Sequence, residues 1–230
     1  MLLSKMKAKY FRWVFLAALA PRAILGFVGG VPAELGESVE ISNDKYRFAG
    51  GTDPWALAYA TFVIVLYVLL LRSKPGEQGE PLLGVLRRFV AFWLDFALGM
   101  MAIVPILGIL PAMAEWKRTG LFAWNFERMT PAPGDGLLAG IGVLLGFVCL
   151  VFFYAWPLMR LLPTPGSCIM GYRIVADEDG ILTVRLWLLR VLLGFIATCA
   201  WPVAPFIRRD KRKGKFWLDK VFKTRAVKLR

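Results

Sequence analysis

Three long apolar segments restrict the fold of this chain more than any other feature of its sequence. They run from Trp55 to Leu71, from Phe89 to Met113 and from Leu137 to Met159. Each is about as long as the roughly 20 residues that a helix needs to cross the hydrocarbon core of a bilayer. A helix also satisfies its backbone hydrogen bonds internally, as that core demands. We therefore predict three membrane-spanning helices.

Composition favours a membrane protein over a nucleic-acid-binding one. Of the 230 residues, 58% are hydrophobic, above the roughly 45–50% typical of soluble domains. The net charge of +13 would suit nucleic acid, but the sequence has no zinc-finger spacing, helix-turn-helix pattern or basic sheet motif with interleaved aromatic residues. We predict no nucleic-acid partner, and we interpret the basic ends as topology signals and contacts with anionic lipid headgroups.

Two further apolar segments are interrupted. Trp13 to Val31 contains Pro21 and Arg22. Its basic lead resembles that of a signal peptide, but a proline directly after the small residues disfavours cleavage, so we predict an uncleaved span. Leu186 to Ile207 contains Arg190 and a break at WPVAP. Its uninterrupted apolar part has about 11 residues, a length typical of re-entrant or interfacial segments.

The distribution of lysine and arginine gives the predicted orientation, because basic segments stay in the cytoplasm. Residues 1–12 and 72–88 hold four each and residues 207–230 hold eleven, whereas the loop 32–53 holds five acidic residues against two basic ones and the loop 114–135 is balanced. With a cytoplasmic N-terminus, five crossings would place the basic segment 207–230 outside the cell. We therefore predict an all-α membrane protein with about four transmembrane helices and one re-entrant or interfacial helix, in the cell (inner or plasma) membrane, with both termini cytoplasmic.

The cytoplasmic part of the chain contains extended segments. Tyr172 to Ala176 is rich in β-forming residues, the acidic turn DEDG follows it, and Ile181 to Val184 is a candidate second strand. Thr224 to Leu229 alternates enough to be a third. Because an isolated pair of strands is marginally stable, we predict a small cytoplasmic β element in which Thr224 to Leu229 pairs with Tyr172 to Ala176.

One carboxylate, Asp95, lies inside the second long segment. An ionised carboxylate at the centre of a membrane helix costs roughly 2.5–3.5 kcal/mol, so it needs a partner. Arg88 is on nearly the same helix face, but seven residues place it about 10.5 Å away along the axis. Arg22 and Arg190 are the other cations near membrane depth, and we predict Arg190 as the partner. A structural ion pair, a role in ion or substrate passage and a protonated acid remain open.

Residue types exclude several enzyme classes. The chain has no histidine, and Cys149, Cys168 and Cys199 form no C-x-x-C pair, so zinc, haem and histidine-based triad chemistry lack their usual ligands or base. No nucleophile–base pair or metal-ligand set is recognisable. We predict a non-enzymatic protein without a cofactor or a metal.

Three sequence blocks resemble the RDD family of multi-pass membrane proteins, named for one arginine and two aspartates. RRFVAFWLD is similar to the family's first membrane helix, with Arg88, Ala91 and Asp95 on its arginine, alanine and first aspartate. TPGSCIMGYRIVADEDG is similar to its T-x-G-K-x-x-x-G-x-x-V stretch and acidic turn. WLDKVFKTRAV is similar to its terminal H-D-K-x-x-x-T-x-V, which places the second aspartate at Asp219 and the threonine at Thr224.

The resemblance covers about residues 82–230 and implies an RDD-like membrane domain at 81–230. Residues 1–80 lie outside it, and we predict that they form an added two-helix membrane hairpin. The family's later Leu-Arg falls on Leu189 and Arg190. The family's usual lysine is Ser167 here and its usual histidine is Leu218, so roles that need those side chains do not transfer. The candidate site residues are a charge set and a cytoplasmic turn: Arg88, Asp95, Arg190 and Asp219, and Thr164, Gly166 and Gly171.

The turn has two interpretations. Its backbone amides either cradle a phosphate or form a tight turn into the following strand. The serine after Gly166, where the family has a lysine, favours the tight turn.

Two functions remain open. A membrane adaptor or assembly protein would bind a membrane or cytoplasmic protein through the β element and the tail. A small transporter or cation/proton exchanger, which the resemblance implies because this activity is suggested for some relatives, would titrate Asp95 and enclose its path by forming a homo-oligomer. We predict the adaptor, with a basic tail that contacts anionic lipid headgroups through Arg208, Arg209, Lys211, Arg212, Lys213 and Lys215.

Overall fold

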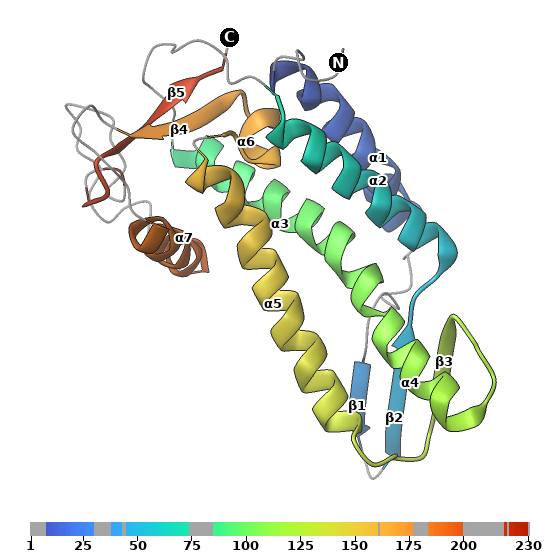
Figure 1. The fold of residues 1–230 in the computed structure, drawn as a ribbon. Coiled ribbons are helices and arrows are strands. Elements are labelled where there is room, and N and C mark those ends of the chain that lie inside the picture. Colours follow the sequence, from blue (N-terminus) through green and yellow to red (C-terminus); the bar gives the residue numbers. More distant parts are fainter. Residues whose placement is uncertain are drawn as a thin grey trace. The chain divides into compact units, whose positions relative to one another are not determined.

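The computed structural model of the chain is mainly helical and adds short strands to the helices (Figure 1). It describes residues 8–29, 38–42, 45–73, 85–160, 162–176, 184–199, 219 and 221–229. The helices are η2 (Ala8–Tyr10), α1 (Phe11–Gly29), α2 (Pro54–Leu71), α3 (Val85–Leu107), α4 (Ile109–Thr119), α5 (Asp135–Met159), α6 (Pro165–Ile169) and α7 (Val184–Cys199). The strands are β1 (Ser38–Ser42), β2 (Lys45–Gly51), β3 (Asn125–Arg128), β4 (Tyr172–Ala176) and β5 (Thr224–Lys228).

The chain forms two compact units, each built from segments that are distant in the sequence. Unit 1 contains Met1–Ala18, Leu66–Ala97 and Val151–Arg230, and unit 2 contains Leu19–Val65 and Leu98–Leu150. The helices α1, α2, α3 and α5 therefore contribute one part to each unit. Each unit also takes residues from both sides of position 80, where the sequence suggested a boundary between a membrane hairpin and an RDD-like domain.

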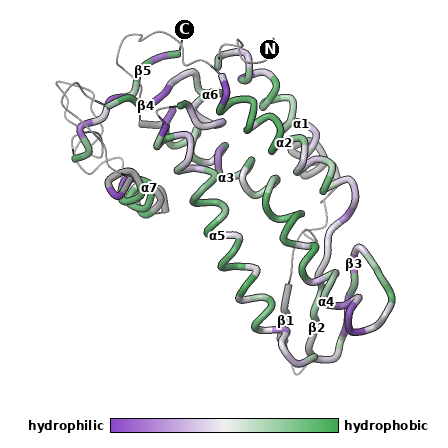
Figure 2. The backbone as a smooth tube through the Cα atoms, in the orientation of Figure 1, coloured by the Kyte–Doolittle hydropathy of each residue, from purple (hydrophilic) through white to green (hydrophobic). Residues whose placement is uncertain are grey.

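Among the residues that the structure describes, three helices are long and apolar enough to cross a membrane, and they coincide with the three long apolar segments of the sequence. They are Pro54–Leu71, Arg87–Thr119, which includes most of α3 and all of α4, and Asp135–Met159. Figure 2 shows α2, α3 and α5 mainly in the colours of hydrophobic residues. In α1 the apolar helix is the shorter Phe11–Pro21, so the fourth span stays a prediction.

The second span contains a break that the sequence did not predict. Helix α3 ends at Leu107 and α4 begins at Ile109, with Gly108 between them. A Cβ atom on Gly108 would lie 2.1 Å from the carbonyl oxygen of Gly51 in β2, so this close approach requires a glycine. Pro105 lies in the last turn of α3, where its missing N–H removes one helical hydrogen bond.

Unit 2 contains an antiparallel sheet that corrects the all-α prediction. Strand β2 lies between β1 and β3, with Val39 opposite Phe48 and Phe48 opposite Arg128. Phe48 is buried and its ring stacks on that of Phe126. The segment SVEIS of β1 alternates polar and apolar residues, which is typical of a strand, but the prediction for this loop rested on its charge alone.

In unit 1, the predicted pairing of the two strands far apart in the sequence is confirmed. Strands β4 and β5 are antiparallel, with Tyr172 opposite Lys228 and Ala176 opposite Thr224. The strand predicted at Ile181 to Val184 is wrong at Val184, which is the first residue of α7. Residues 181–183 lie outside the described residues.

The β4–β5 sheet packs on three helices of unit 1 through a buried apolar cluster. Its members are Ala91 of α3, Ala155 and Leu158 of α5, Tyr172 and Ile174 of β4, Val191 of α7 and Ala226 of β5. This packing brings the first turns of α3, the middle of α7 and β5 into one core. Arg88 and Asp95 of the candidate site lie on α3, Arg190 lies on α7, and Asp219 lies five residues before the start of β5.

Helix α7 covers the first part of the segment predicted to be re-entrant. The break at WPVAP lies outside the described residues, and so do Leu218 and the basic tail residues Arg208, Arg209, Lys211, Arg212, Lys213 and Lys215. Their contact with lipid headgroups stays a prediction.

Candidate functional site

The charge set of unit 1 is centred on Asp219. Arg88 Nη1 donates to Asp219 Oδ2 at 2.5 Å, and Arg190 Nη2 donates to Asp219 Oδ1 at 2.8 Å. Thr224 Oγ1 donates to the same Oδ1 at 3.2 Å. The Asp219 side chain is only 1% exposed, so these donors offset the cost of burying an ionised carboxylate.

This network joins three parts of the chain. Arg88 lies near the start of α3, Arg190 in α7, and Thr224 at the start of β5. The side chains of both arginines are largely buried beside Asp219. A carboxylate that accepts hydrogen bonds from two helices and a strand fixes the positions of all three, because each long side chain reaches its partner in only a few rotamers.

Asp95 has different partners from the one predicted. Thr164 Oγ1 donates to Asp95 Oδ2 at 2.6 Å, and the backbone N–H of Gly166 donates to Asp95 Oδ1 at 2.5 Å. The predicted Asp95–Arg190 pair is wrong, because Arg190 is bonded to Asp219. Helical spacing places Asp95 about 10.5 Å beyond Arg88 along the α3 axis, which separates it from the arginines that meet at Asp219.

The two oxygens of Asp95 complete the N-terminus of α6. Thr164 is the N-cap residue and Pro165 is the first helical residue, which has no N–H to satisfy. The N–H of Gly166 bonds to Asp95, and the N–H of Ser167 bonds to Thr164 Oγ1 at 3.2 Å. Asp95 therefore acts as a cap supplied by another helix, with its side-chain oxygens at the N-terminal end of α6.

The predicted turn at Thr164 is thus a short helix rather than a simple turn. It leads into β4 through Gly171, whose φ of 73° lies in the left-handed region that favours glycine. The amides of Gly166 and Ser167 bond to acceptors within the chain, which favours the tight turn over a phosphate cradle.

Gly166 of α6 lies close to the backbone of Ala91 in α3. A Cβ atom on Gly166 would lie 1.9 Å from the carbonyl oxygen of Ala91 and 2.9 Å from Cγ of Asp95. Both residues are buried. Only a small residue at each position lets the two backbones approach closely enough for the amide of Gly166 to reach the carboxylate.

A sequence profile of the RDD family matches residues 82–221, more than half of the chain. The chain belongs to the RDD family. No curated protein and no solved structure matches it. Within this RDD protein the name-giving residues have two separate roles: Arg88 and Asp219 form an ion pair that joins α3 to the segment before β5, whereas Asp95 caps α6.

The structure divides the predicted charge set and turn into two groups: Arg88 and Arg190 bond to Asp219, and Thr164 and Gly166 bond to Asp95, whereas Gly171 belongs to neither group. The candidate set lacked Ala91 and Thr224. Both occupy positions that match the family's sequence blocks, and this match could have identified them. It also lacked Cys168, whose Sγ donates to the carbonyl oxygen of Ala8 at 2.7 Å.

The Cys168 contact spans 160 positions of the sequence, and nothing in the residue pattern indicated it. Burial raises the pKa of the Cys168 thiol to about 12, because an apolar environment disfavours the thiolate. The protonated thiol can therefore donate to Ala8, and the contact ties η2 to α6 within unit 1.

Proposed function

We propose that this RDD protein is a non-enzymatic membrane adaptor or assembly protein whose β4–β5 sheet presents a binding surface held in place by the Asp219 network. The observation that carries the proposal is that Asp95 and Asp219, the buried carboxylates of the candidate site, accept hydrogen bonds from their own chain. Asp219 accepts from Arg88, Arg190 and Thr224, and Asp95 accepts from the α6 N-terminus. Through these bonds the two carboxylates hold α3, α6, α7 and β5 in position.

Transport by Asp95 is the alternative, and the geometry supports it less well. A carrier must let its titrating carboxylate exchange partners with solvent or with a cation during each cycle. Asp95 is 3% exposed, and both of its oxygens accept short hydrogen bonds, one of them from the backbone of α6. Releasing Asp95 would uncap that helix and disturb the close contact between Gly166 and Ala91.

The first prediction tests these two functions together. A photo-crosslinking amino acid at Lys228, an exposed residue of β5, is expected to trap a protein partner in native membranes. The Asp219→Asn variant should reduce this yield because the sheet loses its anchor. The same crosslinker at Leu137, an exposed residue of α5, is the control and should not trap that partner.

The flux arm of this test uses the purified protein in liposomes under proton, sodium and potassium gradients. We expect wild type and Asp95→Asn to give equal fluxes, no higher than those of empty liposomes. A flux that wild type supports and a folded Asp95→Asn variant does not would overturn the adaptor proposal in favour of exchange. Equal crosslinking at Lys228 and Leu137 would also count against the adaptor.

The adaptor proposal includes a topology in which both termini are cytoplasmic, in the cell membrane, with four crossings. It follows from the basic segments 1–12, 72–88 and 207–230. The three helices long enough to span give an odd number of crossings, so α1 supplies the fourth and α7 does not cross.

The second prediction tests this topology in a variant without the three native cysteines. A single cysteine at Arg47, whose side chain is 46% exposed in β2, should react with a membrane-impermeant maleimide added to intact cells. A single cysteine at Lys228 should react only after permeabilisation. Labelling of the Lys228 position in intact cells would contradict the four-crossing arrangement.

A further inference from the structure

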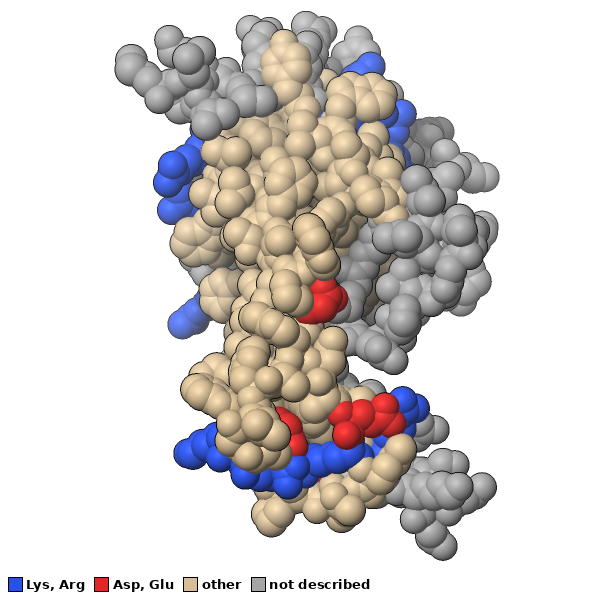
Figure 3. Space-filling model, turned by 90° about the vertical axis from the view of Figure 1, so that its right-hand side faces the viewer, with Lys and Arg blue, Asp and Glu red and all other residues tan. Residues whose placement is uncertain are grey.

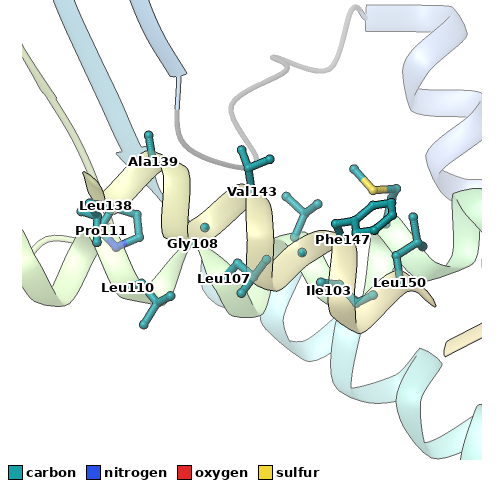
Figure 4. Close-up of a pocket in the computed structure, with 14 residues that line it drawn as sticks. Ile103, Leu107, Gly108, Leu110, Pro111, Leu138, Ala139, Val143, Phe147 and Leu150 are labelled. Atoms are coloured by element: carbon teal, nitrogen blue, oxygen red, sulfur yellow. The ribbon is translucent and has the colours of Figure 1, made fainter. Parts of the chain in front are cut away.

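Unit 2 contains an apolar groove between the α3–α4 pair and α5. Its volume is about 360 Å³, within the range of small-molecule sites. Figure 4 shows side chains of both walls, and the residues used below are Leu107, Pro111, Leu138, Val143 and Phe147. In the most apolar 18-residue stretch of the span that contains α5, 6% of the residues are buried inside the protein, and the α5 residues that line the groove are half-buried or exposed. This wall is therefore open to the hydrocarbon around it.

The groove has the length of one membrane leaflet. Its lining on α3 and α4 extends from Met100 to Pro111, which at the helical rise per residue is about 16 Å. Its lining on α5 extends from Leu138 to Leu150, about 18 Å. Half of the hydrocarbon core of a bilayer is about 15 Å thick, so a lipid chain of one leaflet fits along the groove.

A second cavity of about 420 Å³ continues from one end of this groove. The two cavities share Pro111 and Leu138. The second is lined by charged residues, Lys117, Arg118, Arg128, Glu115 and Asp135. Figure 3 shows lysine, arginine and acidic side chains gathered at the end of the molecule where α4, β2 and β3 lie.

The charges of this second cavity leave an excess of one cation. Arg118 pairs with Glu115, and Arg128 pairs with Asp135. Lys117 is exposed and forms no ion pair with any residue that the structure describes. Two N–H groups of Arg128, at Nε and Nη1, have no hydrogen-bond acceptor among the described residues. An anionic group with several acceptor oxygens, such as a phosphate, complements this set.

We propose that the groove and the charged cavity together form a binding site for one membrane phospholipid, with an acyl chain along α5 and the phosphate at Lys117 and Arg128. The apolar groove alone gives little preference over bulk lipid, because lipid chains are as apolar as the side chains around them. The shape of the groove positions the acyl chain, and the cations of the second cavity supply the selectivity for a phospholipid with an anionic headgroup. The membrane location of α3 and α5 is the only part of the earlier conclusions on which this site depends.

The test uses the full chain in detergent micelles with phosphatidylglycerol that carries a photoactivatable group in the middle of one acyl chain. Mass spectrometry of the cross-linked protein gives the yield and the modified peptides. Val143→Trp fills the groove from an exposed position, and Leu144→Trp is the matched control, since Leu144 is also exposed but does not line the groove. Lys117→Gln removes the unpaired cation, and Lys228→Gln removes a cation from unit 1.

In the wild type we expect one lipid per chain, cross-linked to peptides of α3–α4 and α5. Val143→Trp should abolish these crosslinks, whereas Leu144→Trp should retain them. Lys117→Gln should weaken phosphatidylglycerol binding about fivefold, the effect of one surface cation on an anionic lipid, and Lys228→Gln should leave it unchanged.

Three results would overturn the proposal. The first is equal crosslinking in the Val143→Trp and Leu144→Trp variants, which would place the lipid elsewhere. The second is unchanged phosphatidylglycerol binding in Lys117→Gln, which would remove the phosphate from the charged cavity. The third is a dimer that excludes the lipid and dissociates in Val143→Trp, which would assign the groove to a second copy of the chain.

Discussion

Replacing Gly166 with alanine is expected to lower the free energy of unfolding by about 3 kcal/mol, the upper end of the usual cost of overpacking a core. The added methyl group would lie 1.9 Å from the carbonyl oxygen of Ala91. That oxygen belongs to the backbone of α3, so it cannot move aside as the end of a flexible side chain would. Relief requires α6 to shift, which lengthens the bond from the Gly166 amide to Asp95.

Gly136→Ala is the matched control for this substitution. Gly136 lies in the first turn of α5, and a Cβ atom there would meet nothing within 4 Å. Alanine has a higher helix propensity than glycine, so the control should be at least as stable as the wild type. Unfolding in mixed micelles at increasing dodecyl sulfate content measures both variants. If they unfold at the same dodecyl sulfate content, α6 does not approach α3 as closely as the structure indicates.

Asp219→Asn is expected to be the most destabilising single change in the charge set. It leaves Arg88 and Arg190 without the carboxylate to which both donate. Breaking a buried ion pair by removing one partner costs about 3–5 kcal/mol, because the remaining charge stays desolvated. Here one substitution affects two arginines. The same mixed-micelle unfolding measurement applies, with Glu127→Gln in the exposed Arg47–Glu127 pair as the control, for which a loss of about 0–1 kcal/mol is expected.

Double-mutant cycles then separate the Asp219 network from the Asp95 cap. Arg190→Gln combined with Asp219→Asn should destabilise less than the sum of the single changes, because the second substitution removes the charge left uncompensated by the first. Arg190→Gln combined with Asp95→Asn should be additive, since the two residues share no hydrogen-bond partner. Strong coupling between Asp95 and Arg190 would restore the ion pair that the sequence suggested.

Local sequence patterns correctly predicted the helices and strands that depend on residues close together in the chain. The three long apolar segments predicted the three helices that can span a membrane. The β-forming residues of Tyr172 to Ala176 and the alternation in Thr224 to Leu229 predicted two strands, and the marginal stability of an isolated pair of strands led to the prediction that these two pair with each other. The sheet of β1, β2 and β3 was not predicted, because the prediction for this loop used its charge and not the alternation of polar and apolar residues within SVEIS.

The sequence by itself determined the membrane environment of this protein, its family and the members of the charge set in unit 1, because hydropathy and residue type are properties of single positions. The tertiary structure alone decided which charge meets which. Arg88 and Asp219 are 131 positions apart, and Asp95 and Gly166 are 71 apart. Contacts over such separations depend on how α3, α6, α7 and β5 pack together. Asp95 was assigned to an arginine on charge alone, whereas the packing placed it at a helix N-terminus, where backbone amides satisfy it without any cation.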